Sequence, residues 1–329
     1  MLDRAWGCLM GGAIGDAMGM PASFFTRSKI KETYGYIEDF LEPVAEVQTY
    51  HGNLQAGEVT DDTQESIIIA QVLIEQGFFD KEIFIKKMKQ WAIENNMLES
   101  SVIGPSTRRF LSAVIEGKDP GEGAKLSDTN GSAMRVAPIG IRYYYDFSLC
   151  AKEAAESSLP SHGSAPAMAA ACAVAVACAA GIRGGFSPAQ VMEEARKAAV
   201  YGEEKGFDIP APSVSKRIDL AKRIVDEKKA EGMNVVLDEL VGIFGAGMKS
   251  YESIPIALGV FYAVEGDARQ GIIAAVNAGD DADTNASICG AICGAYSGIK
   301  NLPKDWILRV EKTSGVNFKE IASGLLNIK

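Results

Sequence analysis

The chain has 329 residues and a formal net charge of −10, and 47% of its residues are hydrophobic and 23% charged. This balance is typical of a folded globular protein rather than a disordered one. Its longest basic runs are pairs such as Lys86-Lys87 and Arg108-Arg109, whereas non-specific binding to duplex nucleic acid needs many clustered cations. We therefore expect no nucleic-acid partner.

Helical patterns dominate the chain. Apolar residues recur at the spacing of one helix face in Ile67–Ile74, Ile83–Ile93, Val191–Val200, Ile218–Val225 and Ile256–Val264. Residues that favour helix starts occur at Asp80, Ser187-Pro188, Ser213 and Asp267. Strand-like alternation is scarce, and its best example is the short stretch Val44–Tyr50. These patterns predict a mainly α-helical protein.

The segment Ala165–Ile182 carries no charge over its whole length and is mostly alanine. It is shorter than the ~20 strongly apolar residues that a membrane span requires. Its side chains are small on every side, so other helices can approach it closely. We predict a buried central helix, and we expect no membrane partner.

Turn-rich breaks fall near 25–57, 117–131 and 205–213. None of these breaks is long and polar enough to act as a flexible linker. Residues 1–329 are therefore predicted to form a single domain, with 25–57 and 117–131 as loops over its surface. Loops that a rigid scaffold holds in place are common positions for a functional site.

The cysteines and the N-terminus indicate the compartment. The six cysteines form no C-x-x-C pair, which favours buried free thiols over disulfides or a zinc site. They are Cys8, Cys150, Cys172, Cys178, Cys289 and Cys293. The first residues, Met1–Arg4, do not begin a signal-peptide pattern. We therefore expect a cytoplasmic protein.

Two acidic clusters lie far apart in the sequence, and each precedes a predicted helix. The first is GEVTDDTQE (57–65), and the second is NAGDDADTNA (277–286). Thr and Asp are favoured helix N-caps, and Asp62 with Glu65 resembles an acidic capping box. Taken alone, either cluster is therefore most simply interpreted as a cap.

A cap needs only one side-chain acceptor, however, and each cluster supplies at least two carboxylates together with hydroxyls. Four or five carboxylates brought together without a cation would raise one another's pKa and oppose burial. Divalent ions such as Mg²⁺ or Mn²⁺ bind oxygen ligands of this kind. Spacing alone leaves open whether the two clusters meet.

Over nearly its whole length the chain resembles the ADP-ribosylglycohydrolases, the family of dinitrogenase-reductase-activating glycohydrolase and the mammalian ADP-ribosylhydrolases. Five segments carry the resemblance in the order of the family: GGAIGDAMGMP (11–21), GEVTDDTQE (57–65), NGSAMRVAPIG (130–140), SHGSAPA (161–167) and NAGDDADTNASICGAICGAYSG (277–298). The resemblance implies an all-α orthogonal multi-helix bundle. It also implies two divalent metal ions, Mg²⁺ or Mn²⁺, between the two acidic clusters.

The resemblance further implies the roles of individual residues. The metal ligands would be Thr60, Asp61, Asp62, Asp281, Asp283 and Thr284. The ADP-ribose cleft would be lined by Asn130, Gly131, Ser132 and Met134, with His162 beside the substrate. The expected reaction is hydrolysis of a glycosidic bond of an ADP-ribosylated protein or a small ADP-ribose conjugate. Water would attack the anomeric carbon, and Asp61 or Asp62 would accept its proton.

Other polar residues have less certain roles from the sequence. We expect Asp16 to support the site or the helix packing rather than bind metal, and His51 to be an ordinary loop residue. Arg135 could pair either with phosphate or with a buried carboxylate, and the sequence favours neither.

Two departures from the family pattern leave the substrate open. Ser23 stands where many members have a glutamate, and the second cluster reads GDDADT instead of the common GGDTDT. A second hypothesis is therefore an N-glycosidase for a nucleoside or another small riboside, since a shared fold does not fix the substrate. A third hypothesis is a non-catalytic relative that binds a nucleotide.

Overall fold

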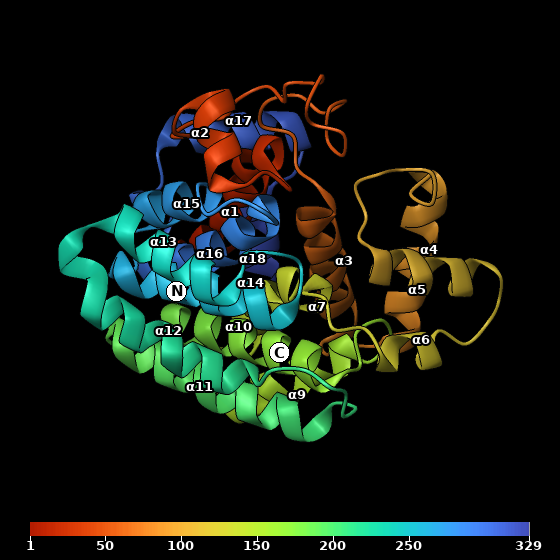
Figure 1. Cartoon of the computed structure of the whole chain (residues 1–329). Helices are drawn as coiled ribbons and strands as arrows, with labels where there is room; N and C mark the ends of the chain where they lie inside the picture. Colours follow the sequence, from red (N-terminus) through yellow and green to blue (C-terminus); the bar gives the residue numbers. More distant parts are fainter. Residues whose placement is uncertain (329) are drawn as a thin grey trace.

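The computed structural model describes residues 1–328, and Figure 1 shows that helices make up its regular structure. The first nine helices are α1 (Leu2–Gly19), α2 (Arg27–Tyr34), α3 (Asp61–Gln76), α4 (Lys81–Glu94), α5 (Pro105–Ile115), α6 (Gly121–Lys125), α7 (Gly131–Met134), α8 (Ala137–Arg142) and α9 (Phe147–Ser158). The others are α10 (Ala165–Arg183), α11 (Pro188–Lys205), α12 (Val214–Lys228), α13 (Met233–Phe244), α14 (Ser250–Ala263), α15 (Ala268–Val276), α16 (Ala282–Ser297), α17 (Lys304–Ser314) and α18 (Phe318–Leu326). Short 3₁₀ helices cover Met20–Ala22, Lys229–Glu231 and Ile299–Asn301.

The helical prediction from the sequence is confirmed. The five periodic segments fall in α3, α4, α11, α12 and α14. The four predicted start residues are all N-caps whose side chains accept a backbone N–H of the first turn: Asp80, Ser187, Ser213 and Asp267. Local capping chemistry and the pattern of apolar residues therefore suffice to locate these helices.

The strand suggested by the sequence at 44–50 is wrong. The residues described contain no β-strand, and they contain only isolated bridge pairings. Residues 44–50 fold into turns, in which the backbone N–H groups of Val47 and Gln48 donate to the carbonyl of Val44. The Gln48 amide donates to the carbonyls of Pro21 and Ser23. A lone strand has no neighbour to pair with, so the backbone groups of this segment bond locally in turns, and the Gln48 side chain ties the segment to the backbone of residues 21–23.

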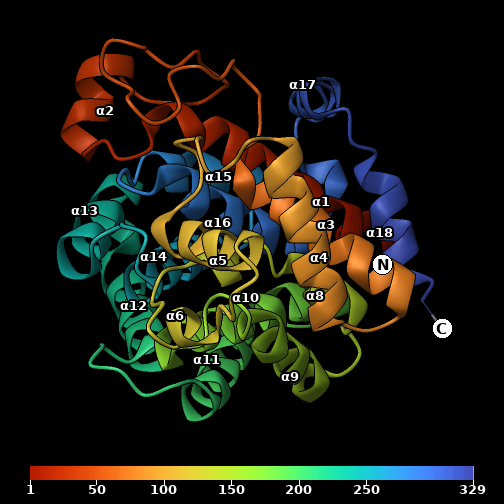
Figure 2. The same ribbon diagram turned by 90° about the vertical axis from the view of Figure 1, so that its right-hand side faces the viewer.

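The breaks predicted at 25–57 and 117–131 are only partly loops. The first contains α2 and the second contains α6, whereas residues 206–213 follow α11 without a helix. Figure 2 shows α2 and the rest of the first break over one corner of the molecule, and α4, α5 and α6 on the face turned toward the viewer. Both breaks therefore lie near the outside of the helical bundle, as expected.

The alanine-rich helix α10 is long and apolar enough to cross a membrane, with a mean hydropathy of 2.0 over its most apolar window. However, 94% of that window is buried inside the protein. The helix packs against α9 and α11 on one side and against α16 on the other. A buried core helix of a folded domain has these properties, which agrees with the sequence prediction.

Helices α1 and α16 cross in close contact along their length because small residues face each other. A Cβ atom added at Gly11 would lie 2.2 Å from the carbonyl oxygen of Gly290, and one at Gly7 would lie 2.5 Å from that of Gly294. Toward the other end of α1, Gly19 meets Ala282 in the same way. The C-terminal end of α1 therefore lies beside the first turn of α16, where the second acidic cluster begins.

Asp16 of α1 holds the start of α3. Its carboxylate accepts hydrogen bonds from both the backbone N–H and the hydroxyl of Thr60, at 3.0 and 2.8 Å. It also accepts from the backbone N–H and the hydroxyl of Thr63, at 3.2 and 2.5 Å. Since α1 also contacts α16, a single helix positions the first turns of the helices that carry the two acidic clusters. Asp16 thus supports the site, as expected from the sequence.

Replacing Gly11 by alanine should destabilise the fold because the new methyl group would overlap the backbone of α16. We expect the free energy of unfolding to fall by about 1–3 kcal/mol, the usual cost of overpacking a core. Gly12 is the matched control, because a Cβ atom there would make only ordinary contacts, at 3.5 Å from Cβ of Ala291 and 3.6 Å from the carbonyl oxygen of Ser287. Urea unfolding measures the free energy of unfolding of both variants. A loss in Gly11→Ala no larger than that in Gly12→Ala would show that the α1–α16 contact tolerates a methyl group.

Replacing Asp16 by asparagine should loosen the start of α3. Asparagine is isosteric with aspartate, but its NH₂ group would face N–H and O–H donors that need an acceptor. We expect the free energy of unfolding to fall by about 3 kcal/mol. Asp267→Asn is the control, because Asp267 accepts a single backbone N–H from Gln270 and asparagine caps a helix equally well. Thermal and urea unfolding of the two variants should therefore differ clearly.

Candidate active site

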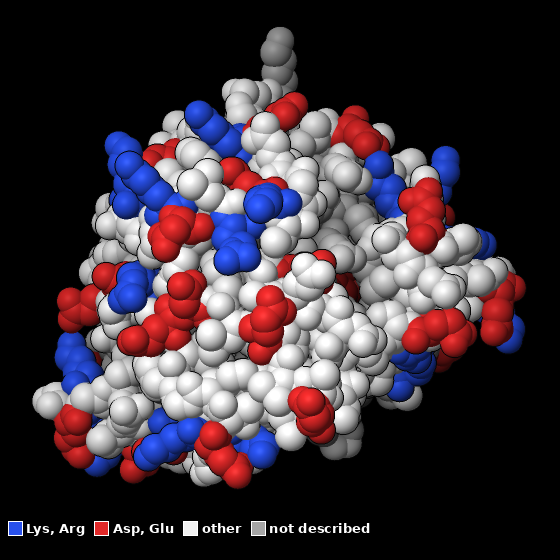
Figure 3. Space-filling view, turned by 90° about the horizontal axis from the view of Figure 1, so that it is seen from above, with Lys and Arg blue, Asp and Glu red and all other residues white. Residues whose placement is uncertain are grey.

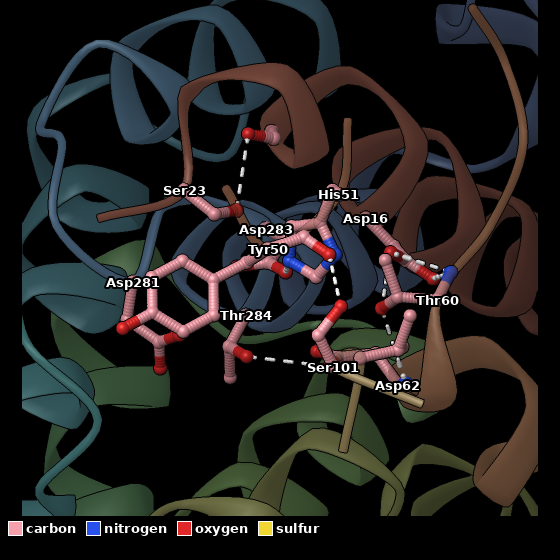
Figure 4. A network of polar contacts seen from close by, with 12 residues as sticks. Asp16, Ser23, Tyr50, His51, Thr60, Asp62, Ser101, Asp281, Asp283 and Thr284 are labelled. Atoms are coloured by element: carbon pink, nitrogen blue, oxygen red, sulfur yellow. Dashed lines mark hydrogen bonds and ion pairs between the residues drawn. The ribbon is translucent and has the colours of Figure 1, made fainter. Parts of the chain in front are cut away.

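The two acidic clusters meet in one pocket. The hydroxyl of Thr284 donates to Oδ2 of Asp62 at 3.3 Å, although the two residues are 222 positions apart. Figure 4 shows this contact, with Asp281 and Asp283 beside it. The pocket has an empty volume of about 450 Å³, and its acidic and hydroxyl lining includes Asp61, Asp62, Asp281, Asp283 and Thr284. The convergence that the sequence alone could not settle is therefore present.

The first cluster is capped by a residue other than the carboxylates. Thr60 is the N-cap of α3, and its hydroxyl accepts from the backbone N–H of Asp62 at 3.4 Å. The suggested capping box of Asp62 and Glu65 does not form, because Glu65 pairs with Arg135 at 2.6 Å instead. Asp61 and Asp62 are both buried, and capping does not occupy their carboxylates. Thr60 itself is not among the side chains that line the pocket, so its role as a metal ligand stays a prediction.

The second cluster also leaves its carboxylates free of capping. Asp281 occupies the N-cap position of α16, but its side chain makes no cap hydrogen bond. Instead, the Asn130 amide donates to Oδ2 of Asp281 at 2.6 Å. Asp280, one residue earlier, is exposed and has a left-handed backbone with φ of 53°. The interpretation as helix caps therefore holds for Thr60 of the first cluster, whereas the second cluster makes no side-chain cap.

A backbone pairing between residues 24–25 and Asp280 holds the backbone beside the second acidic cluster in a strained conformation. Phe24 has a φ of 65°, which is rare for a residue other than glycine. Its N–H donates to the carbonyl of Asp280 at 2.5 Å, and the N–H of Asp280 donates to the carbonyl of Phe25 at 2.7 Å. The Phe24 side chain lines the pocket. Strain of this kind is found where the surrounding structure forces a functional geometry.

His51 is a site residue that the sequence analysis missed. Its Nε2 lies 3.2 Å from Oδ2 of Asp283, and its side chain is only 2% exposed (Figure 4). Gln48 fixes the turn around it, because Oε1 of Gln48 accepts from the backbone N–H groups of Tyr50 and His51. His51 also lines the pocket. No local pattern marks a histidine in a turn-rich segment as functional, so only the tertiary contact reveals it.

The predicted substrate-binding residues line the same pocket, with one exception. Asn130, Gly131, Met134 and His162 line the pocket. Ser132 does not; its hydroxyl donates to the carbonyl of Ala167 on α10 at 3.3 Å. Arg135 is fully buried in its ion pair with Glu65, which decides between the two roles that the sequence left open: it forms a structural salt bridge.

The carboxylates of the pocket resist being charged together. Burial raises the pKa of Asp61, Asp62 and Asp281, and the negative charges of neighbouring carboxylates add to the increase. Burial also acts to raise the pKa of Asp283, but the contact with His51, helped by the nearby Ser23 hydroxyl, lowers it overall. A bound cation would relieve the repulsion among these groups, because an opposite charge nearby favours the ionised form.

The donor set fits a divalent cation. Oδ1 of Asp62 and Oδ1 of Asp283 are buried and lack a hydrogen-bond partner, and an unpaired buried carboxylate oxygen is costly. Oxygen atoms of carboxylates and hydroxyls are the ligands that Mg²⁺ and Mn²⁺ prefer. As they stand, residues 1–328 contain no group of three or more His, Cys, Asp or Glu side chains arranged to hold a metal ion. The side chains would therefore have to draw together around an ion.

Comparison with known proteins gives the family. A model of the ADP-ribosylglycohydrolase family matches residues 1–328. An uncharacterized protein of Archaeoglobus fulgidus is 34% identical over 93% of this chain and 91% of its own length. The ADP-ribosylarginine hydrolase Tri1 of Pseudomonas putida is 26% identical over 94% of this chain and 74% of its own.

Solved structures agree with the fold. One described as an ADP-ribosylglycohydrolase-related protein complex superimposes with a TM-score of 0.69, at 24% identity, over 99% of this chain and 98% of that chain. This likeness confirms the all-α fold of the family. The match of the family model over residues 1–328 shows that the chain belongs to the ADP-ribosylglycohydrolases, a family of hydrolases.

Proposed function

We propose that the chain hydrolyses the glycosidic bond of an ADP-ribosylated protein or a small ADP-ribose conjugate with the help of two divalent metal ions, Mg²⁺ or Mn²⁺. The observation that carries the proposal is the convergence of Asp61 and Asp62 with Asp281 and Asp283 in one buried pocket. These carboxylates come from segments more than two hundred residues apart, and their burial is unfavourable without a cation.

The proposed ligands of the ions are the residues of the two clusters. They are Thr60, Asp61, Asp62, Asp281, Asp283 and Thr284. When bound, such ions polarise substrate oxygens and lower the pKa of water. The chain supplies the orientation of the ligands: the Asn130 amide fixes Asp281, and His51 fixes Asp283.

The residues of the pocket then account for the remaining steps. Gly131, Met134 and His162 hold the ADP-ribosyl group against the carboxylates. Water attacks the anomeric carbon while the bond to the leaving group breaks, and positive charge develops on the sugar ring. The nearby carboxylates stabilise that charge. Asp61, whose side chain makes no hydrogen bond to another side chain in residues 1–328, or Asp62 accepts the proton of the water.

A second candidate is an N-glycosidase that acts on a nucleoside or another small riboside. Ser23, where many family members carry a glutamate, is completely buried and adjoins Asp283. His51 contacts the same carboxylate from the 44–54 turns. This side of the pocket therefore differs from the family pattern, which favours a different leaving group.

The cytoplasmic location stays a prediction. All six cysteines are buried free thiols, which is compatible with a reducing compartment.

The face in Figure 3 carries interspersed basic and acidic side chains rather than one basic patch. That face therefore presents no clustered cations of the kind that bind nucleic acid.

Replacing Asp281 by asparagine should abolish turnover. Loss of groups that merely orient metal ligands already costs about 10–100-fold in affinity or activity, so we expect loss of a ligand to cost more than about 100-fold. Asp280→Asn is the matched control, because Asp280 is exposed and asparagine tolerates its left-handed backbone. Calorimetric titration with Mn²⁺ and turnover assays read both variants; full activity in Asp281→Asn would refute the proposed ligand set.

A substrate panel separates the two enzyme candidates. The wild-type protein is assayed with ADP-ribosyl-arginine, ADP-ribosyl-serine peptides and nucleosides, each with Mg²⁺ or Mn²⁺ and with a chelator. We expect release of ADP-ribose that stops when the metal is removed. Turnover of nucleosides alone would establish the second candidate, and failure to bind divalent ions would favour a non-catalytic relative.

A further inference from the structure

A chain of buried hydrogen bonds runs behind the pocket from α3 to the loop before α7. Arg135 donates from Nη1 to Glu65 at 2.6 Å and from Nη2 to the Ser161 hydroxyl at 2.7 Å. The Ser161 hydroxyl in turn lies 2.7 Å from Nδ1 of His162. On the other side of the ring, Nε2 of His162 lies 3.1 Å from the Thr129 hydroxyl. Both ring nitrogens of His162 are therefore engaged by the protein.

Arg135 is fixed in this chain. Its side chain is 1% exposed and that of Glu65 is fully buried. The guanidinium group also lies 4.8 Å from the ring centre of Phe84. A buried arginine bound on one side to a carboxylate and stacked on an aromatic ring has little freedom to turn. The Nη2 atom of Arg135 is therefore held toward the Ser161 hydroxyl.

The direction of every hydrogen bond in the chain follows from Arg135. A guanidinium group donates and cannot accept, so the oxygen of Ser161 must accept from it. Within residues 1–328 the only other side-chain partner of this hydroxyl is Nδ1 of His162. The Ser161 proton therefore goes to Nδ1, and the ring proton of a neutral His162 sits on Nε2. Nε2 then donates to Thr129, whose own hydroxyl donates to Ser106 at 3.0 Å.

The other protonation states fit less well. A proton on Nδ1 would leave the Ser161 proton without an acceptor, and a doubly protonated ring would do the same. Burial lowers the pKa of His162 well below its usual value, and the charges of Arg135 and Arg109 add to the effect. The neutral ring with its proton on Nε2 is the state in which both ring nitrogens and the hydroxyls of Ser161 and Thr129 all have partners.

The fixed ring supports the wall of the pocket. A Cβ atom at Gly131 would lie 2.7 Å from Nε2 of His162, so the ring presses directly against the backbone of that residue. Gly131 lines the pocket, and its neighbour Asn130 holds Asp281 at 2.6 Å. The position of the His162 ring therefore affects the backbone that carries both a substrate contact and a partner of the acidic cluster.

We propose that Arg135 and Ser161 are positioning residues that hold His162 as one neutral tautomer with its proton on Nε2, so that the ring buttresses residues 129–131 and takes no part in proton transfer. The assignment of the tautomer stands independently of the proposed function. The effect on ligand binding rests on that function.

The tautomer can be read directly, because the chain has only two histidines. Two-bond ¹H–¹⁵N correlation spectra of the full-length protein with ¹⁵N-labelled histidine distinguish a protonated ring nitrogen from an unprotonated one. His51→Gln leaves His162 as the only histidine and assigns the signals. We expect Nε2 of His162 to be protonated and Nδ1 unprotonated, without change between pH 5.5 and 8. A proton on Nδ1, or a ring that titrates in this range, would overturn the proposal.

Ser161→Ala tests the origin of the tautomer. Without the hydroxyl, Nδ1 loses its donor. We therefore expect the ¹⁵N chemical shifts of the two ring nitrogens to approach values averaged between the two tautomers. Ser158→Ala is the matched control, because Ser158 is equally buried and its hydroxyl donates only to the carbonyl of Ala154. Unchanged His162 signals in Ser161→Ala would refute the role of Ser161. The wild-type spectrum decides the tautomer even if this variant fails to fold.

The affinity for ADP-ribose tests whether the fixed His162 ring supports the wall of the pocket. In calorimetric titrations with Mg²⁺ present, we expect Ser161→Ala to bind ADP-ribose roughly tenfold more weakly than the wild type, the scale of one net hydrogen bond. Ser158→Ala should bind as the wild type does. Equal affinity in all three would overturn the buttressing role. Failure of the wild type to bind ADP-ribose would count against the proposed function and leave the tautomer to the spectra.

Discussion

The close crossing of α1 and α16 is the contact on which the site depends. Glycines on both helices remove the side chains that would keep the two backbones apart. Gly11 and Gly290 lie so close that a Cβ atom at Gly11 would overlap the carbonyl oxygen of Gly290. This crossing brings the end of α1 to the first turn of α16. Asp16, three residues before Gly19, then binds Thr60 and Thr63 at the start of α3. Helix α1 thereby fixes the positions of the two acidic clusters relative to each other.

The resulting pocket concentrates unfavourable features that a protein selected only for stability would avoid. Carboxylates with raised pKa values face one another, buried carboxylate oxygens lack partners, and Phe24 and Asp280 adopt strained backbones. Such features cluster at functional sites, where the rest of the fold compensates for them. Here the compensation comes from the apolar core of α1, α10 and α16, whose residues are almost all buried.

The polar residues around the pocket divide into two groups with different partners. On one side, Asn130 and His51 contact the carboxylates themselves. On the other side, Glu65 and Arg135 lie one layer deeper and act through Ser161 on His162. Ser23 adjoins Asp283 on the side of the first group, and it is the position at which the sequence departs from the pattern it otherwise resembles. The deeper layer sets the shape of the wall beside Gly131.

The sequence by itself determined the helical class, the positions of several helices and the two acidic clusters, because these depend on interactions between residues close in the chain. Caps such as Asp80 and Ser187 bind backbone groups three residues away, and apolar periodicity needs no distant partner. Only the tertiary structure decided that Asp62 meets Thr284, that Glu65 pairs with Arg135 instead of capping its own helix, and that His51 reaches Asp283. These contacts join segments from 70 to 232 positions apart, and no local pattern encodes which distant partner a buried polar group will find.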